Sequence, residues 1–128
     1  MPEFSTFTLE QANDALHEVL LITDAAIERL RAIEQPWAQL PYKKFDALRG
    51  VAEEDLIRAE WAHRIASLGV IPKGFFVVDF PSIDDPDLLY CWSYGEDCVA
   101  HEHKTWETFI QRRHVGSTQR ARPQREGR

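Results

Sequence analysis

Hydrophobic positions in the first third of the chain recur every three or four residues, the period of an amphipathic α-helix. The segment Thr8-Leu9-Glu10-Gln11 fits a capping box, in which the threonine hydroxyl and the glutamine side chain each bind a free backbone amide. The run ends at Pro36, so the pattern predicts a helix of about 27 residues, roughly 40 Å long. The apolar stripe comprises Leu9, Ala12, Leu16, Val19, Leu20, Ala26, Ile27, Leu30 and Ile33.

The same period returns after a short connector and predicts a second helix. Gly69 and Pro72 supply its stop signals, and the connector Pro36–Pro41 is short enough to favour an antiparallel hairpin. Two helices leave their outer apolar flanks in water. We therefore expect a sheet across one end, or a second copy of the chain that completes a four-helix bundle. The apolar positions of this helix are Phe45, Leu48, Ala52, Leu56, Ala59, Ala62, Ile65 and Ala66.

From residue 75 the hydrophobic pattern changes from helical to extended. Residues 75–80 are rich in β-formers and stop at Pro81, residues 82–87 indicate a loop, and residues 88–94 and 97–103 predict two more strands. The predicted fold class is α+β: a long antiparallel helical hairpin, then a small three-stranded antiparallel sheet. One domain is expected over residues 1–113, followed by a disordered basic tail over residues 114–128.

The turn between the last two predicted strands suggests a register. If Gly95 and Glu96 form a type II′ turn, Tyr94 faces Asp97, Trp92 faces Val99, Tyr90 faces His101 and Leu88 faces His103. Those pairs share one face of the sheet, whereas Cys91 and Cys98 fall on the opposite face as a diagonal pair. Diagonal neighbours lie about 7–8 Å apart, beyond the reach of a disulfide, so free thiols are predicted.

Composition limits the class of protein. The chain has 128 residues, of which 44% are hydrophobic and 28% are charged, values that suit one soluble domain with a core of its own. No apolar run reaches the ~18 residues of a membrane span, and the first residues lack the pattern of a signal peptide. Two cysteines are too few for a disulfide scaffold. We expect a cytoplasmic protein that does not associate with membranes.

Charge is distributed unevenly along the chain. Six of the 15 basic residues but only one of the 21 acidic residues follow position 111, so the first 111 residues have nine basic and 20 acidic side chains, a net charge of −11. Such an acidic body repels nucleic acids. The arginine-rich tail could contact RNA or another anionic partner; alternatively, it is a solubilising extension or folds back on the acidic body.

Short motifs occur in a fixed order near both ends of the chain. They are Phe7-Thr8-Leu9-Glu10-Gln11-Ala12-Asn13, Val78-Asp79-Phe80-Pro81, Cys91-Trp92, Gly95-Glu96, His103, Phe109 and Arg112-Arg113. Their order and spacing resemble a small bacterial family known as domain of unknown function 2203. The resemblance implies a helical hairpin followed by a small antiparallel sheet, and it implies no activity. Two departures stand out: Ser93 replaces an arginine, which removes that partner for Glu96, and Phe76-Val77 replaces a glycine–leucine pair.

His101 and His103 form an H-x-H pair, and alternate residues of a strand point to the same face. Two imidazoles on one face are a start for a site that binds zinc or another divalent transition metal. Acidic ligands could come from Asp79, at the end of the first strand, and Glu96, in the turn. The alternative is that both histidines lie at the surface or an interface and that Asp79 caps a turn.

Other chemistry has weaker support in the sequence. Glu60 and His63 have the i, i+3 spacing of di-iron bundles, yet the same spacing is typical of a solvated helix face. Cys91 lies in mid-strand without a cationic neighbour in sequence, which indicates a small buried side chain rather than a nucleophile. The chain contains no P-loop, G-x-G-x-x-G, G-x-S-x-G or H-E-x-x-H motif.

Three further residues are candidates for binding roles. Trp92 is expected in the core. Arg112 and Arg113 lie within the motif series, and at least one of them is expected to pair with a core carboxylate such as Asp79 or Glu96.

Three function hypotheses follow. The first is a non-catalytic binding or scaffold module that acts through the hairpin, as a homodimer or with a protein partner, with Trp37 and Trp61 exposed or at an interface. The second is a metal-binding protein, hydrolytic in one version, that holds a divalent metal such as zinc with His101, His103, Asp79 and Glu96. The third is an RNA contact through the arginine-rich tail.

Overall fold

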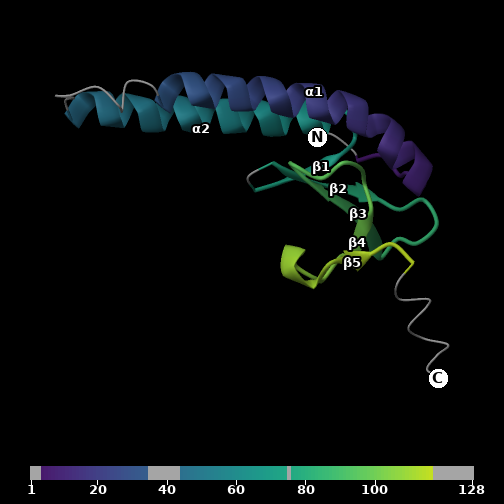
Figure 1. The fold of residues 1–128 in the computed structure, drawn as a ribbon. Coiled ribbons are helices and arrows are strands. Elements are labelled where there is room, and N and C mark those ends of the chain that lie inside the picture. The colour runs from purple at the N-terminus through teal and green to yellow at the C-terminus, as the bar shows by residue number, and fades with distance from the viewer. Residues whose placement is uncertain (1–3, 35–43, 75, 117–128) are drawn as a thin grey trace.

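The computed structural model describes residues 4–34, 44–74 and 76–116 of the chain. Two antiparallel helices form a long hairpin, and one end of the hairpin lies over an antiparallel sheet (Figure 1). The predicted α+β class is therefore correct. The elements are α1 (Leu9–Glu34), α2 (Lys44–Ser67), β1 (Ile71–Lys73), β2 (Val77–Pro81), β3 (Leu88–Ser93), β4 (His101–Lys104), the 3₁₀ helix η2 (Phe109–Gln111) and β5 (Arg113–His114).

Helix α1 begins where the capping box predicts. The Gln11 backbone N–H donates to Thr8 Oγ1 at 3.0 Å, and the Thr8 backbone N–H donates to Gln11 Oε1 at 2.9 Å. Both groups would otherwise lack a helical partner, so this reciprocal pair sets the first residue of the helix. Neither helix among the described residues is both long and apolar enough to cross a bilayer.

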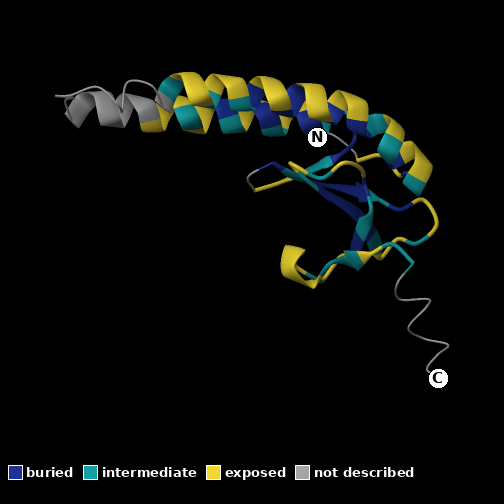
Figure 2. Cartoon of the chain, in the orientation of Figure 1, coloured by how far each residue is buried: buried dark blue, intermediate teal, exposed yellow. Residues whose placement is uncertain are grey.

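The buried face of α2 differs from the one predicted. Ile65 is buried as predicted, but Ile57 and Trp61 are buried as well. Three predicted core residues are exposed: Ala52, Leu56 and Ala59. Turning the helix this way buries a tryptophan and an isoleucine in place of a leucine and an alanine, which removes more apolar surface from water. Figure 2 shows the buried residues concentrated between the helices and in the sheet. Phe45 and Leu48 lie outside the described side chains.

Trp61 is buried within the chain, whereas the sequence predicted it to be exposed or at an interface. Its side chain is only 4% exposed, and its indole N–H donates to the hydroxyl of Thr23, which is fully buried in α1, at 2.9 Å. The ring also packs edge-on against Phe76, with centroids 5.1 Å apart. This tryptophan therefore joins α1, α2 and the start of β2. Trp37 lies outside the described residues.

The sheet has five strands in the order β1-β2-β3-β4-β5, rather than the three predicted. Strand β1 contains Pro72, which the sequence indicated only as a helix stop; a proline is tolerated here because β1 is an edge strand. Strand β5 is only two residues long and pairs with β4 through Arg113 and His114. Its brevity left no periodic pattern for prediction.

The predicted register between the last two long strands is wrong by one residue. Cys91, not Tyr90, pairs with His101, and Leu89, not Leu88, pairs with His103. Residues 94–100 form a loop in place of the two-residue turn, so residues 97–100 belong to no strand.

Asn13 of α1 provides the physical reason for this loop. Its amide accepts from the Val99 backbone N–H at 2.8 Å and donates to the Val99 carbonyl at 3.1 Å. Val99 therefore pairs with a helix side chain instead of with Trp92. The exposed Cys98 lies in the same loop, and the prediction that both cysteines are free thiols is confirmed.

The register gives the sheet two different faces. Val78, Phe80, Tyr90 and Trp92 point toward the helices and join the hydrophobic core. The alternate residues therefore point to the other face of the sheet. This second face carries polar side chains, and the segment after β4, with η2, lies against it.

The N-terminal segment joins the sheet before α1 begins. Phe7 accepts from the Ile83 backbone N–H and donates to the Pro81 carbonyl, forming a parallel bridge with Ser82. The Ser5 backbone N–H donates to the carbonyl of Gly69, at the end of α2. Gly69 has φ +83°, and a Cβ there would lie 2.2 Å from Ser5 Oγ, so glycine is required.

Phe76 occupies a strained backbone position. Its φ of +64° lies in the left-handed region, which glycine adopts readily and a bulky side chain does not. The family resemblance of the sequence implies a glycine at this position. Packing of the phenylalanine ring on Trp61 offsets the strain here.

The Thr23–Trp61 hydrogen bond is testable by a double-mutant cycle. Thr23→Val leaves the buried indole N–H without an acceptor and is expected to lower the free energy of unfolding by about 1–3 kcal/mol. In a Trp61→Phe background the same change is expected to cost about 1 kcal/mol less, because no donor remains. Urea unfolding followed by circular dichroism measures the four free energies. Additive effects of the two changes would contradict this account.

Candidate metal centre

Three chemically reactive side chains meet on the second face of the sheet. Asp79, Cys91 and His103 come from β2, β3 and β4, three neighbouring strands. Asp79 of β2 pairs directly with Cys91 of β3. On the neighbouring strand β4, Cys91 pairs with His101, and His103 is therefore its diagonal neighbour. One ligand atom from each residue lies within 4.8 Å of the other two, and all three residues are buried, with exposures of 1%, 0% and 3%.

His103 is held in one orientation by two contacts. Its Nδ1 lies 2.7 Å from the Lys104 carbonyl oxygen, which can only accept, so Nδ1 carries the proton. Nε2 lies 3.1 Å from both carboxylate oxygens of Asp79. In a neutral ring Nε2 has a lone pair, which a carboxylate repels. The arrangement is therefore stable only with a proton or a metal cation between Nε2 and Asp79.

Cys91 is a poor nucleophile in the metal-free protein. Burial, followed by the charge and hydrogen bond of Asp79, raises the pKa of its thiol to about 12. Arg112 Nη1, 3.9 Å from the sulfur, only partly offsets this increase in the pKa. Deprotonation of Cys91 near neutral pH requires a stronger local charge, such as a bound metal ion.

A cavity of about 320 Å³ opens onto these three residues. Lys73, from β1, lies at its edge, with Nζ 3.5 Å from Asp79 Oδ2 and about half of its side chain exposed. The cavity therefore gives a small molecule access to the otherwise buried group. Its lining residues are Lys73, Gly74, Val77, Asp79, Cys91, His103, Glu107, Thr108 and Phe109.

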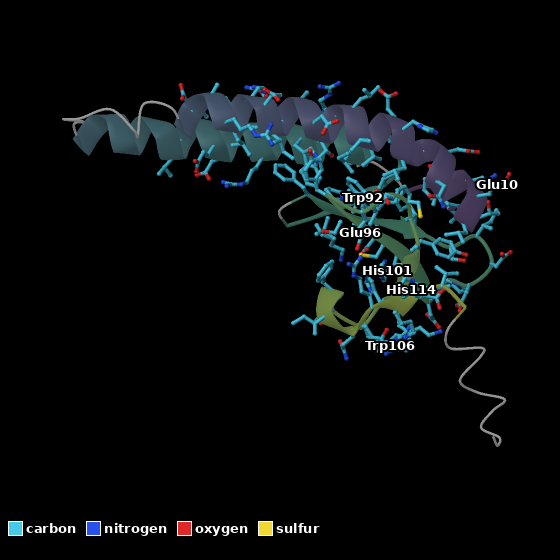
Figure 3. The ribbon with its side chains drawn as sticks, in the orientation of Figure 1. Glu10, Trp92, Glu96, His101, Trp106 and His114 are labelled. Atoms are coloured by element: carbon cyan, nitrogen blue, oxygen red, sulfur yellow. The ribbon has the colours of Figure 1, made fainter. Side chains whose placement is uncertain are left out.

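The four ligands predicted from the sequence separate into two groups. Asp79 and His103 lie together as predicted. Glu96 and His101 lie further along the same face, where Glu96 forms a bidentate ion pair with Arg112. His101 Nδ1 is 3.7 Å from Glu96 Oε2, and its ring packs on His114 with centroids 4.4 Å apart (Figure 3).

The ion pair with Arg112 determines the electrostatics of the second group. Burial alone would raise the pKa of Glu96, but hydrogen bonds from Arg112 and the Ser93 backbone N–H outweigh it and hold that pKa below its ordinary value. The pKa of His101 is also lowered, because burial and the Arg112 charge outweigh the attraction of Glu96. These groups form an ion-paired network next to the cavity.

Sequence reasoning missed Cys91 as a partner of Asp79 and His103. The wrong register placed Cys91 on the opposite face from the histidines, and a one-residue error reverses every such assignment. A signal was present, because Asp79, Cys91 and His103 all belong to the motif series of the sequence.

The expectation for the two arginines is confirmed through Arg112, which pairs with Glu96. Ser93 replaces an arginine that was expected to pair with Glu96, and Arg112 takes that role instead. Its guanidinium also lies 4.1 Å from the centroid of the Phe109 ring. Arg113 instead binds both carboxylate oxygens of Glu107 at 2.7 Å.

The other candidate site residues predicted from the sequence contact residues outside the metal centre. Trp92 is 1% exposed, and its indole N–H donates to the Glu96 carbonyl. Glu60 and His63 are exposed on α2, and Glu60 pairs with Arg29 of α1 at 2.6 Å. Most of the arginine-rich tail, residues 117–128, lies outside the described residues.

Comparison with known proteins gives one match. Residues 5–115 match the family described as an uncharacterized conserved protein, DUF2203. No curated protein and no solved structure matches the chain. The match spans the helical hairpin, the sheet and all three residues of the candidate metal centre, so the chain belongs to the DUF2203 family.

Proposed function

We propose that this protein binds a divalent transition metal ion, with Zn²⁺ the best fit, through Asp79, Cys91 and His103. One observation carries the proposal: a carboxylate oxygen, a thiol sulfur and an imidazole nitrogen, all buried, lie within 4.8 Å of one another. Bonds of about 2.0–2.3 Å to a central Zn²⁺ put ligand atoms roughly 3.3–3.8 Å apart. His103 Nε2 and the Asp79 oxygens are already 3.1 Å apart, so the largest separation has to shorten by only about 1 Å.

The chemistry of the three groups supports the choice of metal. Zn²⁺ accepts mixed nitrogen, oxygen and sulfur ligands, and a ligating histidine typically donates its other N–H to a backbone carbonyl or a carboxylate. The Lys104 carbonyl already accepts from His103 Nδ1 and directs Nε2 toward Asp79. A bound metal would also stabilise the Cys91 thiolate, which burial disfavours in the metal-free protein.

Lys73 is the cation of the described residues that competes directly for Asp79. Its ammonium lies 3.5 Å from Asp79 Oδ2, and metal binding would displace it. The lysine side chain is 47% exposed and has a flexible stem, so it can move into solvent at little cost. Metal binding thus exchanges one cation for another at the buried carboxylate.

Three protein ligands leave the fourth position of a tetrahedral ion open toward the cavity. In zinc proteins an open position is typical of catalytic sites, where the ion activates a water molecule, and closed four-ligand sites are structural. Hydrolysis is accordingly the reaction class that this site supports. The free thiols of Cys91 and Cys98 suit the reducing conditions of a cytoplasm, where we place the protein.

Metal binding is testable on untagged protein by titration with Co²⁺ and by elemental analysis after reconstitution with Zn²⁺. The wild-type protein is expected to take up about one equivalent and to show a thiolate-to-cobalt charge-transfer band. Cys91→Ala and His103→Ala are each expected to weaken binding by at least about 100-fold, since each removes a ligand.

His101→Ala is the matched control, because His101 lies two residues before His103 on the same strand and packs on His114. It is expected to bind metal like the wild type. An equal loss in His101→Ala would instead favour the ligand set with His101 and Glu96. Absence of metal from the folded wild-type protein, even after reconstitution, would reject the proposal.

The helical hairpin supports a second candidate function, a homodimeric interaction module. It extends well beyond the sheet (Figure 1), and in this part the apolar residues Ile27, Leu30 and Ile33 are only partly buried. Leu21 and Leu56 are 65% and 53% exposed on the two helices. A second hairpin would cover these side chains in an isologous bundle.

Sedimentation equilibrium tests this second candidate. A dimer is expected, and Leu21→Lys and Leu56→Lys are each expected to weaken association by about tenfold or more while leaving the fold intact. Ile110→Lys is the control, because Ile110 is 90% exposed on η2, away from the hairpin. A monomer at every concentration tested would refute the dimer.

A further inference from the structure

The cavity beside the candidate ligands has features that metal binding alone does not require. Its volume of about 320 Å³ is at the lower end of the range for ligand pockets, which suits a small molecule. Its wall combines the cation of Lys73 with the apolar surfaces of Val77 and Phe109. Lys73 and Val77 are direct cross-strand partners in β1 and β2, and Phe109 comes from η2. A cation next to apolar surface defines the chemistry of a ligand.

We infer that this cavity binds a small organic carboxylate with an apolar substituent. The carboxylate occupies the open metal position beside Lys73, and the substituent lies on Phe109 and Val77. The inference rests on the proposed metal site and names the class of ligand that this site takes.

The charges around the cavity favour an anion. The Lys73 ammonium lies 3.5 Å from Asp79 Oδ2, and it becomes available to a ligand once Asp79 binds the metal. Glu107 also lines the cavity, but Arg113 binds both of its oxygens and the Lys104 backbone N–H donates to it. With Glu107 neutralised in this way, the charge left facing a ligand is positive.

The apolar side of the cavity is pre-formed. The Phe109 ring is held by the Arg112 guanidinium, 4.1 Å from its centroid, and Arg112 is itself fixed by Glu96. Phe109 remains 43% exposed despite these contacts. A ligand that covers the ring removes apolar surface from water without reorganising the protein, so an apolar substituent strengthens binding.

The visible spectrum of the full chain loaded with Co²⁺ tests this inference, because it changes when a ligand enters the open coordination position. Phenylacetate carries both features, phenylacetamide lacks the charge and acetate lacks the apolar group. Phenylacetate is expected to bind at least about tenfold more tightly than either of the others, since each lacks one of two favourable contacts.

Lys73→Met separates the anion site from the metal site. It keeps the apolar stem and removes the charge, so phenylacetate binding is expected to weaken by about tenfold or more. Co²⁺ affinity is expected to stay the same or rise, because the competing ammonium is gone. Arg31→Met is the charge control: Arg31 pairs with Glu28 on α1 and does not line the cavity, so both affinities are expected to be unchanged.

The outcomes distinguish the two proposals. Equal binding of phenylacetate and phenylacetamide, or no effect of Lys73→Met on phenylacetate, would overturn the anion site. Binding of Co²⁺ with no response to any probe would also overturn it and leave the metal proposal in place. Failure of Co²⁺ to bind would overturn the metal proposal and the anion site together.

Discussion

The register of β3 against β4 is the constraint on which the candidate metal centre depends, and a contact outside the sheet sets it. Asn13 of α1 binds both backbone groups of Val99, so the chain loops toward the helix before β4 begins. Because side chains alternate along a strand, a slip of one residue would turn His101 and His103 into the apolar core. A single amide on a helix therefore decides which residues meet on the far face of the sheet.

The two faces of the sheet bury different kinds of side chain. The face toward the helices buries apolar side chains such as Phe80 and Trp92, and this burial is the main source of stability. The second face buries Asp79 and His103, whose polar atoms need partners, and each finds one. Among the described residues, the short segment after β4 covers this face, and its ion pairs with Glu96 and Glu107 help to hold it in place. A site can lie there because neither of the two described helices fills this space.

The parts of the fold that depend on neighbouring residues could be predicted from the sequence. The capping box at Thr8 and Gln11 and the helical period after it give α1 and its first residue correctly. The register could not be predicted, because the contact that sets it joins residues 86 positions apart. The same limit applies to the site. Asp79 and His103 could be identified from their residue types, whereas the place of Cys91 beside them follows only from the register of β3 against β4. The buried face of α2 was missed because Trp61 finds its hydrogen-bond partner on another helix.

The contacts of the N-terminal segment bear on how the chain folds during synthesis. Phe7 and Asn13 are made well before their partners Ser82 and Val99. At about 5–20 residues per second, roughly 4–17 s separate the synthesis of Asn13 from that of Val99. During that interval α1 has only α2 to pack against, and the side of α1 that faces the sheet stays exposed. The core between α1 and the sheet is therefore complete only after β4 has been made.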